Sequence, residues 1–371
     1  MISLVGRLLA PEDQGVRLVV VEDGRVSRIA DPDEAPAEAI GGHDNWIVPG
    51  LVDIQLNGAF GVDFSDPAAD LGRAASTLPA TGVTAFLPTI VSLAPDRYAA
   101  AIANLSQPAR VGAARALGIH LEGPYLSPQR RGAHDPSALR SPDVDEAASW
   151  LALGPMRMVT LAPELAGAIP LIERLVAEGV IVAIGHTDAT WTQADDAIRA
   201  GARLGTHLFN AMRPFHHRDP GAAGRLLAPG VAVSVVTDGV HVAPEVVALV
   251  AELKAPDELI LVTDGLAALG RPAGSYRLGS QEVVSDGTVA RLTDGTISGS
   301  VTPMAPALGR LVAGGLDPET AVRGASTNPA RLLGVEDQLG CIAVGRVADL
   351  VLLDASWNPV RTFVEGVAAD V

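Results

Sequence analysis

The sequence predicts an α/β protein: a (β/α)8, TIM-like barrel with a small β-sandwich domain formed from both termini. Between residues 49 and 338, about eight apolar runs of strand length alternate with segments of helical periodicity, as in repeated βα units. Both ends instead contain short strands with tight turns. The length of 371 residues is enough for one large barrel and a small accessory unit.

The two ends have the same local pattern. Residues 16–21 and 25–29 are branched apolar runs that flank Glu22-Asp23-Gly24, and Asp-Gly is a favoured hairpin turn. The C-terminal runs 345–354 and 360–366 are similar. We therefore expect residues 1–48 and 339–371 to form one small β domain, and residues 49–338 to form the barrel.

The expected barrel strands are short apolar runs bounded by polar or turn residues. They are residues 51–56, 83–87, 116–121, 156–161, 180–184, 203–207, 231–236 and 259–263. Ala-rich segments such as 162–178 and 191–200 have the period of helices. Residues 279–297 contain two Asp-Gly turns and predict a β-hairpin after the last strand.

Composition argues against several classes of protein. A net charge of −16 and aromatic residues at only 4% oppose a nucleic-acid surface. The one cysteine, Cys341, rules out an intrachain disulfide, and residues 1–10 lack the features of a signal peptide. No apolar run is long enough to cross a membrane. We expect a cytoplasmic protein without nucleic-acid or membrane partners, and an anionic substrate would need a local basic pocket.

Four polar residues stand at the ends of different expected strands: Glu122, His186, His207 and Asp264. The carboxyl ends of barrel strands are where such folds assemble their active sites. One carboxylate and two imidazoles suit a catalytic divalent metal, best zinc, with one position open for an activated water. Asp264 would then serve as the general base and acid. Lys254 is the one lysine, so no barrel lysine can bridge metals or form a Schiff base.

Each of these residues also has a simpler interpretation. A single histidine at a strand end is more often a structural hydrogen-bonding group, Glu122 could cap a helix, and Asp264 could cap a turn. Their occurrence on four different strand ends favours a metal site. His43, His216 and His217 lie in polar loops and are interpreted as solvated surface.

Seven motifs follow one another along the chain: residues 49–55, 120–125 (His-Leu-Glu-Gly-Pro-Tyr), 161–164, 185–187, 206–212 (Thr-His-Leu-Phe-Asn-Ala-Met), 238–241 and 263–265. In this order they resemble the N-acetylglucosamine-6-phosphate deacetylases of the amidohydrolase superfamily. The resemblance covers about residues 49–330. It implies a metal-dependent amide hydrolase that removes acetate from a phosphorylated amino sugar.

The resemblance also implies the role of individual residues. Glu122, His186 and His207 match the metal ligands, Asp264 the catalytic acid and base, and His134 the group that binds the acetamide carbonyl. Arg218 and His241 match the phosphate-binding pair, with His241 reaching in from the second subunit of a homodimer. The other matching substrate contacts are Ala133, Asn210, Ala211, Ile297, Ser298 and Gly299.

Two departures from the superfamily pattern affect the expectations. Many members carry His-x-His on the first strand and bind a second metal there, whereas this chain has Gln55 and Asn57. Amides are poor zinc ligands, so we expect a single metal. The loop of residues 265–268 is also unusual in sequence, which leaves its shape open.

Three alternatives remain at this stage. The first is a related amidohydrolase acting on N-acetylgalactosamine 6-phosphate, and the second is one acting on an N-acyl-D-amino acid or a cyclic amide. The phosphate-binding pair Arg218 and His241 favours a sugar phosphate over the latter two substrates. The third is an inactive sugar-phosphate sensor, which would not need a base beside a metal.

Overall fold

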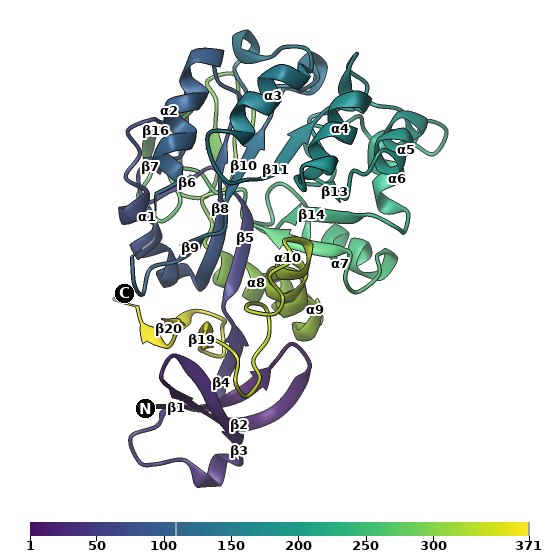
Figure 1. Ribbon diagram of the computed structural model, residues 1–371. Coiled ribbons are helices and arrows are strands. Elements are labelled where there is room, and N and C mark those ends of the chain that lie inside the picture. Colours follow the sequence, from purple (N-terminus) through teal and green to yellow (C-terminus); the bar gives the residue numbers. More distant parts are fainter. Residues whose placement is uncertain (108–109, 370–371) are drawn as a thin grey trace.

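The computed structural model describes residues 1–107 and 110–369 and has two parts, a barrel and a sheet beneath it (Figure 1). The barrel strands run parallel in the order β5-β8-β10-β11-β12-β13-β14-β15. They are β5 (Leu51–Leu56), β8 (Val83–Ile90), β10 (Ile119–Glu122), β11 (Met156–Leu161), β12 (Ile181–Ile184), β13 (Leu204–Gly205), β14 (Ala232–Val236) and β15 (Leu259–Val262). This confirms the predicted eight-stranded TIM-like barrel.

The last and first strands meet at a seam that closes the barrel. A parallel bridge joins Leu56 to Gly265, and the backbone N–H of Asn57 donates to the Gly265 carbonyl at 2.7 Å. Below this bridge, the hydroxyl of Thr263 donates to the buried carboxyl of Asp53. The seam therefore depends on a few specific contacts made by Thr263 and Gly265, which lie on either side of Asp264 just after β15.

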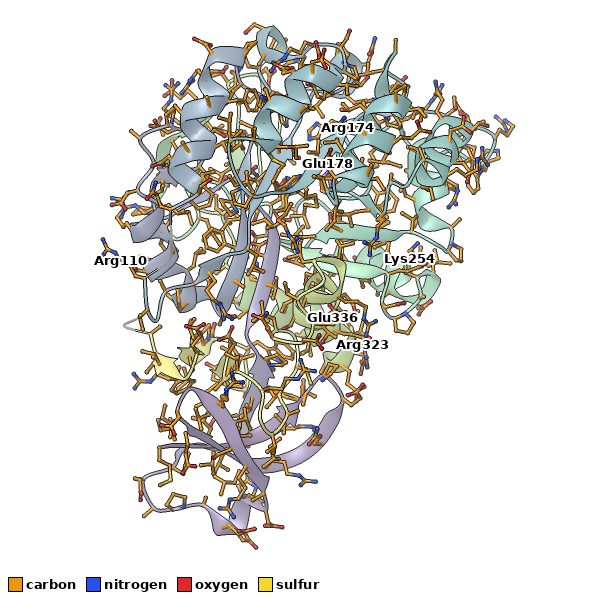
Figure 2. All side chains as sticks on the ribbon, viewed as in Figure 1. Arg110, Arg174, Glu178, Lys254, Arg323 and Glu336 are labelled. Atoms are coloured by element: carbon orange, nitrogen blue, oxygen red, sulfur yellow. The ribbon has the colours of Figure 1, made fainter. Side chains whose placement is uncertain are left out.

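Helices cover the outside of the barrel because one face of each is apolar. On α4 (Ala168–Ala177) the buried residues Ala168, Leu171, Ile172 and Leu175 follow helical spacing, while Arg174 and Glu178 pair at 2.8 Å on the outer side (Figure 2). Gly167, with φ 88°, precedes α4, so the expected helix over 162–178 begins later than predicted. The other helices are α1 (Leu71–Thr77), α2 (Pro95–Leu105), α3 (Val144–Leu151), α5 (Trp191–Arg199), α6 (Gly221–Leu227), α7 (Pro244–Leu253), α8 (Met304–Ala313), α9 (Pro318–Val322) and α10 (Asn328–Leu332).

Lys254 directly follows α7 on this outer layer (Figure 2). Its ammonium donates to the carbonyls of Leu226 and Ala228 at 3.1 and 2.8 Å and pairs with Glu258 at 3.1 Å. The single lysine thus has a structural role outside the barrel. No helix among residues 1–107 and 110–369 is long and apolar enough to cross a membrane.

The terminal strands form a separate seven-stranded sheet in the order β21-β20-β19-β4-β1-β2-β3. A bridge between Arg25 and Val347 brings the β3 edge back to the segment before β19, so the sheet folds over a common core. These strands are β1 (Ile2–Leu9), β2 (Asp13–Glu22), β3 (Arg25–Ala30), β4 (Ile40–Pro49), β19 (Leu350–Leu353), β20 (Pro359–Val364) and β21 (Val367–Ala368). The turn between β2 and β3 has Asp23 and Gly24 at φ 49° and 74°, as the predicted hairpin requires. β4 pairs with β19, which joins the two ends of the chain.

A three-stranded antiparallel sheet follows β15 and forms part of the cavity wall described below. It consists of β16 (Gly274–Leu278), β17 (Gln281–Ser285) and β18 (Ala290–Arg291). The Asp286 carboxylate accepts from the N–H groups of Thr288 and Val289 at the turn that the sequence predicted. Ser280 donates to Asp135 at 2.6 Å, which ties this sheet to the segment after β10. The remaining short strands are β6 (Gly58–Ala59), β7 (Val62–Asp63) and β9 (Arg115–Ala116).

Candidate metal centre and active site

Four polar side chains meet at the carboxyl end of the barrel. Glu122 is the last residue of β10, and His186, His207 and Asp264 each lie two residues after their strand. These last three have φ values of 48°, 33° and 51°, in the left-handed region. Such residues cost about 1–3 kcal/mol each and concentrate at functional sites. The fold therefore maintains backbone strain at three of the positions that the sequence singled out.

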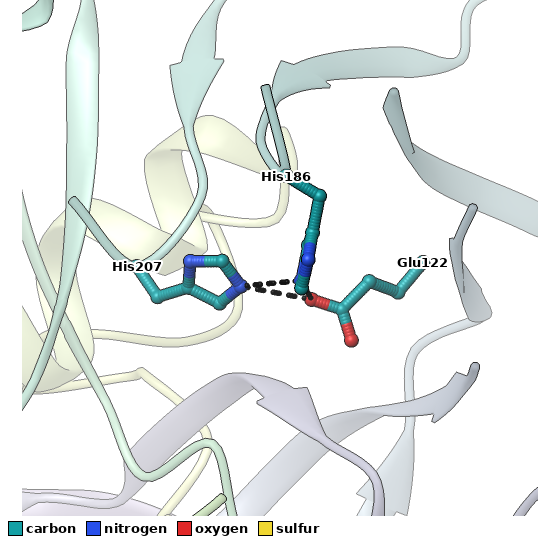
Figure 3. Close-up of side chains that lie close together, drawn as sticks. All are labelled: Glu122, His186 and His207. Carbon is teal, nitrogen blue, oxygen red and sulfur yellow. Dashed lines mark hydrogen bonds and ion pairs between the residues drawn. The ribbon is translucent and has the colours of Figure 1, made fainter. Parts of the chain in front are cut away.

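Glu122, His186 and His207 direct their ligand atoms at a common point (Figure 3). Glu122 Oε1 lies 3.1 Å from His186 Nε2 and 3.0 Å from His207 Nε2, and the two nitrogens are 3.0 Å apart. Donor atoms about 2.0–2.1 Å from a tetrahedral zinc lie about 3.3 Å from one another. The triangle is thus close to the size that a metal of this kind requires.

The proton positions also fit a cation. His186 Nδ1 donates to the Arg130 carbonyl at 3.0 Å, so its Nε2 presents a lone pair to the Glu122 carboxylate. Burial opposes the charge of Glu122, but its close contacts with the imidazoles of His134, His186 and His207 outweigh burial and hold its pKa well below the ordinary value. Burial lowers the pKa of His186 to about 4. Carboxylate and neutral imidazole are the forms that bind metals, so Glu122 and His186 are in the forms that suit a divalent metal. Burial opposes the charge of His207, but the neighbouring Glu122 outweighs it and raises the pKa of His207.

His134 lies beside this triangle with its proton on the atom that faces it. Its Nδ1 accepts from the Ser92 backbone N–H at 3.2 Å and is 2.8 Å from the Ser92 hydroxyl. A backbone N–H can only donate, so the neutral ring carries its proton on Nε2. That Nε2 is 3.6 Å from Glu122 Oε2. The Nε2–H group is therefore available to an oxygen atom bound at the site.

Asp264 completes the group from the seam of the barrel. Asn57 Nδ2 donates to Asp264 Oδ1 at 2.8 Å. Burial and then the negative charge of Glu122 raise the pKa of Asp264 to about 6. A carboxyl group with a pKa near neutrality can both accept and return a proton.

These residues open into a cavity of about 390 Å³, a size typical of small-molecule sites. Its walls include the predicted ligands and Asp264, and the predicted substrate contacts Ala133, His134, Asn210, Ala211, His241, Ile297, Ser298 and Gly299. Val91, Gln129, Met212, Leu278 and Thr296 also line it. The one predicted contact that does not line the cavity is Arg218.

His241 lines the cavity of its own chain, and its expected contribution to a second subunit stays a prediction. Asp238 fixes it there, accepting from its Nδ1 at 2.7 Å and from its backbone N–H at 2.9 Å. Arg218 instead is exposed, and its guanidinium lies 2.8 Å from His217 Nε2. His43, His216 and His217 are exposed, as predicted.

Sequence reasoning missed the groups that orient the site residues. Ser92 lies two residues after β8, so the strand-end rule that identified the ligands would also have found it. Beneath Glu122, the buried His120 contacts Thr89 at 3.3 Å and Thr160 at 2.7 Å. Burial lowers the pKa of His120 to about 4, which keeps this imidazole neutral. No sequence pattern indicates these partners, because they lie on separate strands.

Comparisons with known proteins agree with this geometry. Residues 46–369 match the amidohydrolase family. The human N-acetylglucosamine-6-phosphate deacetylase is 40% identical over 86% of this chain and 82% of its own. An N-acetylgalactosamine-6-phosphate deacetylase of Escherichia coli O157:H7 is 36% identical over 86% of both.

Solved structures give the same result. One is the N-acetyl-D-glucosamine-6-phosphate deacetylase of Mycobacterium smegmatis, solved as an aspartate-to-alanine variant in complex with N-acetyl-D-glucosamine-6-phosphate. This chain superposes on it with a TM-score of 0.92 at 37% sequence identity. The match covers 100% of this chain and 99% of that one. As the sequence motifs predicted, the chain belongs to the amidohydrolase family and, within it, to the N-acetylglucosamine-6-phosphate deacetylases.

Proposed function

We propose that this protein hydrolyses N-acetylglucosamine 6-phosphate to glucosamine 6-phosphate and acetate, with one zinc ion per chain. The observation that carries the proposal is the triangle of Glu122, His186 and His207 beside Asp264, in one cavity. The substrate is the one named for the human and mycobacterial relatives. Gln55 and Asn57 support a single metal, since neither amide is a good zinc ligand.

Glu122, His186 and His207 would hold the metal, which would supply Lewis acidity and a water activated near neutral pH. Asp264 accepts the proton that the attacking water loses and later delivers it to the departing amine nitrogen. Its carboxyl lies in the same cavity, with a pKa raised by burial to about 6. Proton transfer by a positioned group of matched pKa contributes about 100- to 10,000-fold to a rate.

His134 binds the acetamide carbonyl. Its Nε2–H is free of other acceptors except the distant Glu122 Oε2, since Ser92 occupies Nδ1. The carbonyl oxygen gains negative charge as the tetrahedral species forms, so a fixed donor stabilises the transition state more than the substrate.

The phosphate requires positive charge that the acidic chain as a whole does not provide. His241 lies in its own cavity, and Arg218 is exposed outside it. The protein acts as a homodimer in which each subunit supplies Arg218, rather than His241, to the phosphate in its partner's cavity. Arginine suits this role because its planar guanidinium binds phosphate through two hydrogen bonds.

The galactosamine epimer is the second candidate substrate. The Escherichia coli relative that is named for it is 36% identical, nearly as similar as the human glucosamine enzyme at 40%. Sugar hydroxyls would contact the same walls, Asn210 and the 297–299 segment, in either case.

The proposal is tested by acetate release from zinc-loaded protein with N-acetylglucosamine 6-phosphate, the unphosphorylated sugar and N-acetylgalactosamine 6-phosphate. We expect kcat/KM for the first to exceed that for the unphosphorylated sugar by about 100-fold or more. The unphosphorylated sugar leaves the charged phosphate-binding groups without a hydrogen-bonding partner, which is costly. Equal rates for those two sugars would exclude a phosphate site, and a higher rate with the galactosamine epimer would assign that substrate instead.

Metal content tests the ligand set. The purified protein should bind one zinc per chain by elemental analysis, and Glu122→Gln should lower zinc affinity at least about 100-fold by removing the charged ligand. His43→Ala, which changes an exposed histidine, should leave the affinity unchanged. Two zinc ions per chain in the unaltered protein would contradict the single-metal site.

Asp264→Asn should lower kcat by at least about 1,000-fold, because the amide cannot take up the proton. Zinc content should remain one per chain, since Asp264 is outside the ligand triangle. Substantial turnover by this variant would reject Asp264 as the base, whereas loss of zinc would make it a ligand.

Mixed dimers identify the residue that crosses between subunits. When the Arg218→Ala and Asp264→Asn variants are refolded together, half of the dimers are mixed, and each mixed dimer contains one complete site. We therefore expect the mixture to regain about a quarter of the wild-type activity at low substrate concentration. His241→Ala with Asp264→Asn should regain none. Recovery by the His241 pair alone would restore the original expectation, and sedimentation as a monomer would exclude both.

A further inference from the structure

Asn57 occupies a position between the first strand of the barrel and the proposed base. It directly follows β5, is 3% exposed and lines the cavity. Its backbone N–H and that of Gly58 both donate to the Gly265 carbonyl, at 2.7 and 3.2 Å. These two hydrogen bonds fix the main chain around Asn57 relative to Asp264. The Asn57 side chain therefore extends toward Asp264 from a fixed position.

The hydrogen bond from Asn57 to Asp264 has only one possible direction. Nδ2 of an amide has no lone pair for a proton, so it donates to Asp264 Oδ1 and cannot accept. Turning the amide around would place its oxygen against the carboxylate oxygen. Among the described residues, Asn57 is the one side chain that donates to this carboxylate within hydrogen-bonding distance.

We infer that Asn57 is a positioning residue that assigns the two oxygens of Asp264 different roles, which rests on the proposed function of Asp264 as the base. Oδ1 is held by the amide, and Oδ2 is the oxygen left to exchange a proton with the water and then with the amine. A carboxylate without this contact could rotate and present either oxygen, so fewer encounters would have the geometry for transfer. Asn57 acts through Asp264 and does not take part in the proton transfer itself.

A purely structural role for Asn57 predicts different behaviour. The same amide could serve only to hold the seam between β15 and β5, in which case its loss would lower thermal stability and leave kcat unchanged. Positioning predicts loss of kcat with KM and zinc content preserved, because neither the ligand triangle nor the other cavity walls contact the Asn57 side chain through a hydrogen bond.

The chain contains a matched control for burial of an asparagine. Asn328 is 2% exposed, and its Nδ2 donates to the carbonyls of Pro256 and Leu259 at 2.8 and 2.7 Å. Like Asn57, it has a buried Oδ1 without a partner in the described part of the chain. Asn328 begins α10 and contacts the first residue of β15, whereas Asn57 contacts Asp264, the second residue after the end of that strand.

The experiment compares Asn57→Ala, the isosteric Asn57→Asp and Asn328→Ala in zinc-loaded protein. We expect both Asn57 variants to lose at least about 30-fold in kcat, less than the loss of the base itself, with KM within about threefold and one zinc per chain. Asn328→Ala should lower Tm at least as much as Asn57→Ala but keep kcat within about threefold. Retention of kcat in both Asn57 variants would overturn the inference.

A second measurement does not depend on activity. The loss of Tm caused by Asn57→Ala should shrink by at least about half in an Asp264→Ala background, because the hydrogen bond is already absent there. An undiminished loss would show that the two side chains are not coupled. If the unaltered protein releases no acetate from any of the three sugars, the proposed function fails, whereas normal wild-type turnover with active Asn57 variants rejects the inference alone.

Discussion

The buried negative charge of Glu122 is the constraint on which the rest of the site depends. An ionised carboxylate without partners in the interior is costly by many kcal/mol, so it must be paired with hydrogen-bond donors or a cation. His134, His186 and His207 converge on it from separate segments, and the same charge helps to raise the pKa of Asp264. One carboxylate thus organises both the candidate metal triangle and the proposed acid–base group, Asp264.

The parallel barrel supplies this convergence because its strands all end at one rim. The sequence predicted the eight strands and the polar residues that meet at their ends, Glu122, His186, His207 and Asp264, since apolar runs that end in a polar residue are a local signal. It also located the hairpins, through their Asp-Gly turns. Strand-end polar residues and Asp-Gly turns are features of short segments, so they can be recognised in the sequence without knowing which strands pair.

The sequence could not show how distant parts of the chain lie relative to one another. The order in which the terminal strands pair, such as β4 beside β19, has no local signature. The exposure of Arg218 and the enclosure of His241 likewise depend on how two loops pack. Ser92 and Asn57 stand at strand ends, but their hydrogen bonds span 42 and 207 residues of sequence, so no local motif identifies the side chains that they reach.

The location of the seam has a consequence for how the protein gains its activity. Glu122 ends β10, and His186 and His207 follow β12 and β13, all in the middle of the strand order. Asp264 and Asn57 instead follow the last and the first strands. A chain in which only the central strands have assembled would therefore already hold the candidate metal triangle without Asp264 beside it. Under the proposed function, metal binding would show that the central strands have assembled, and turnover would show that the two ends of the barrel have joined.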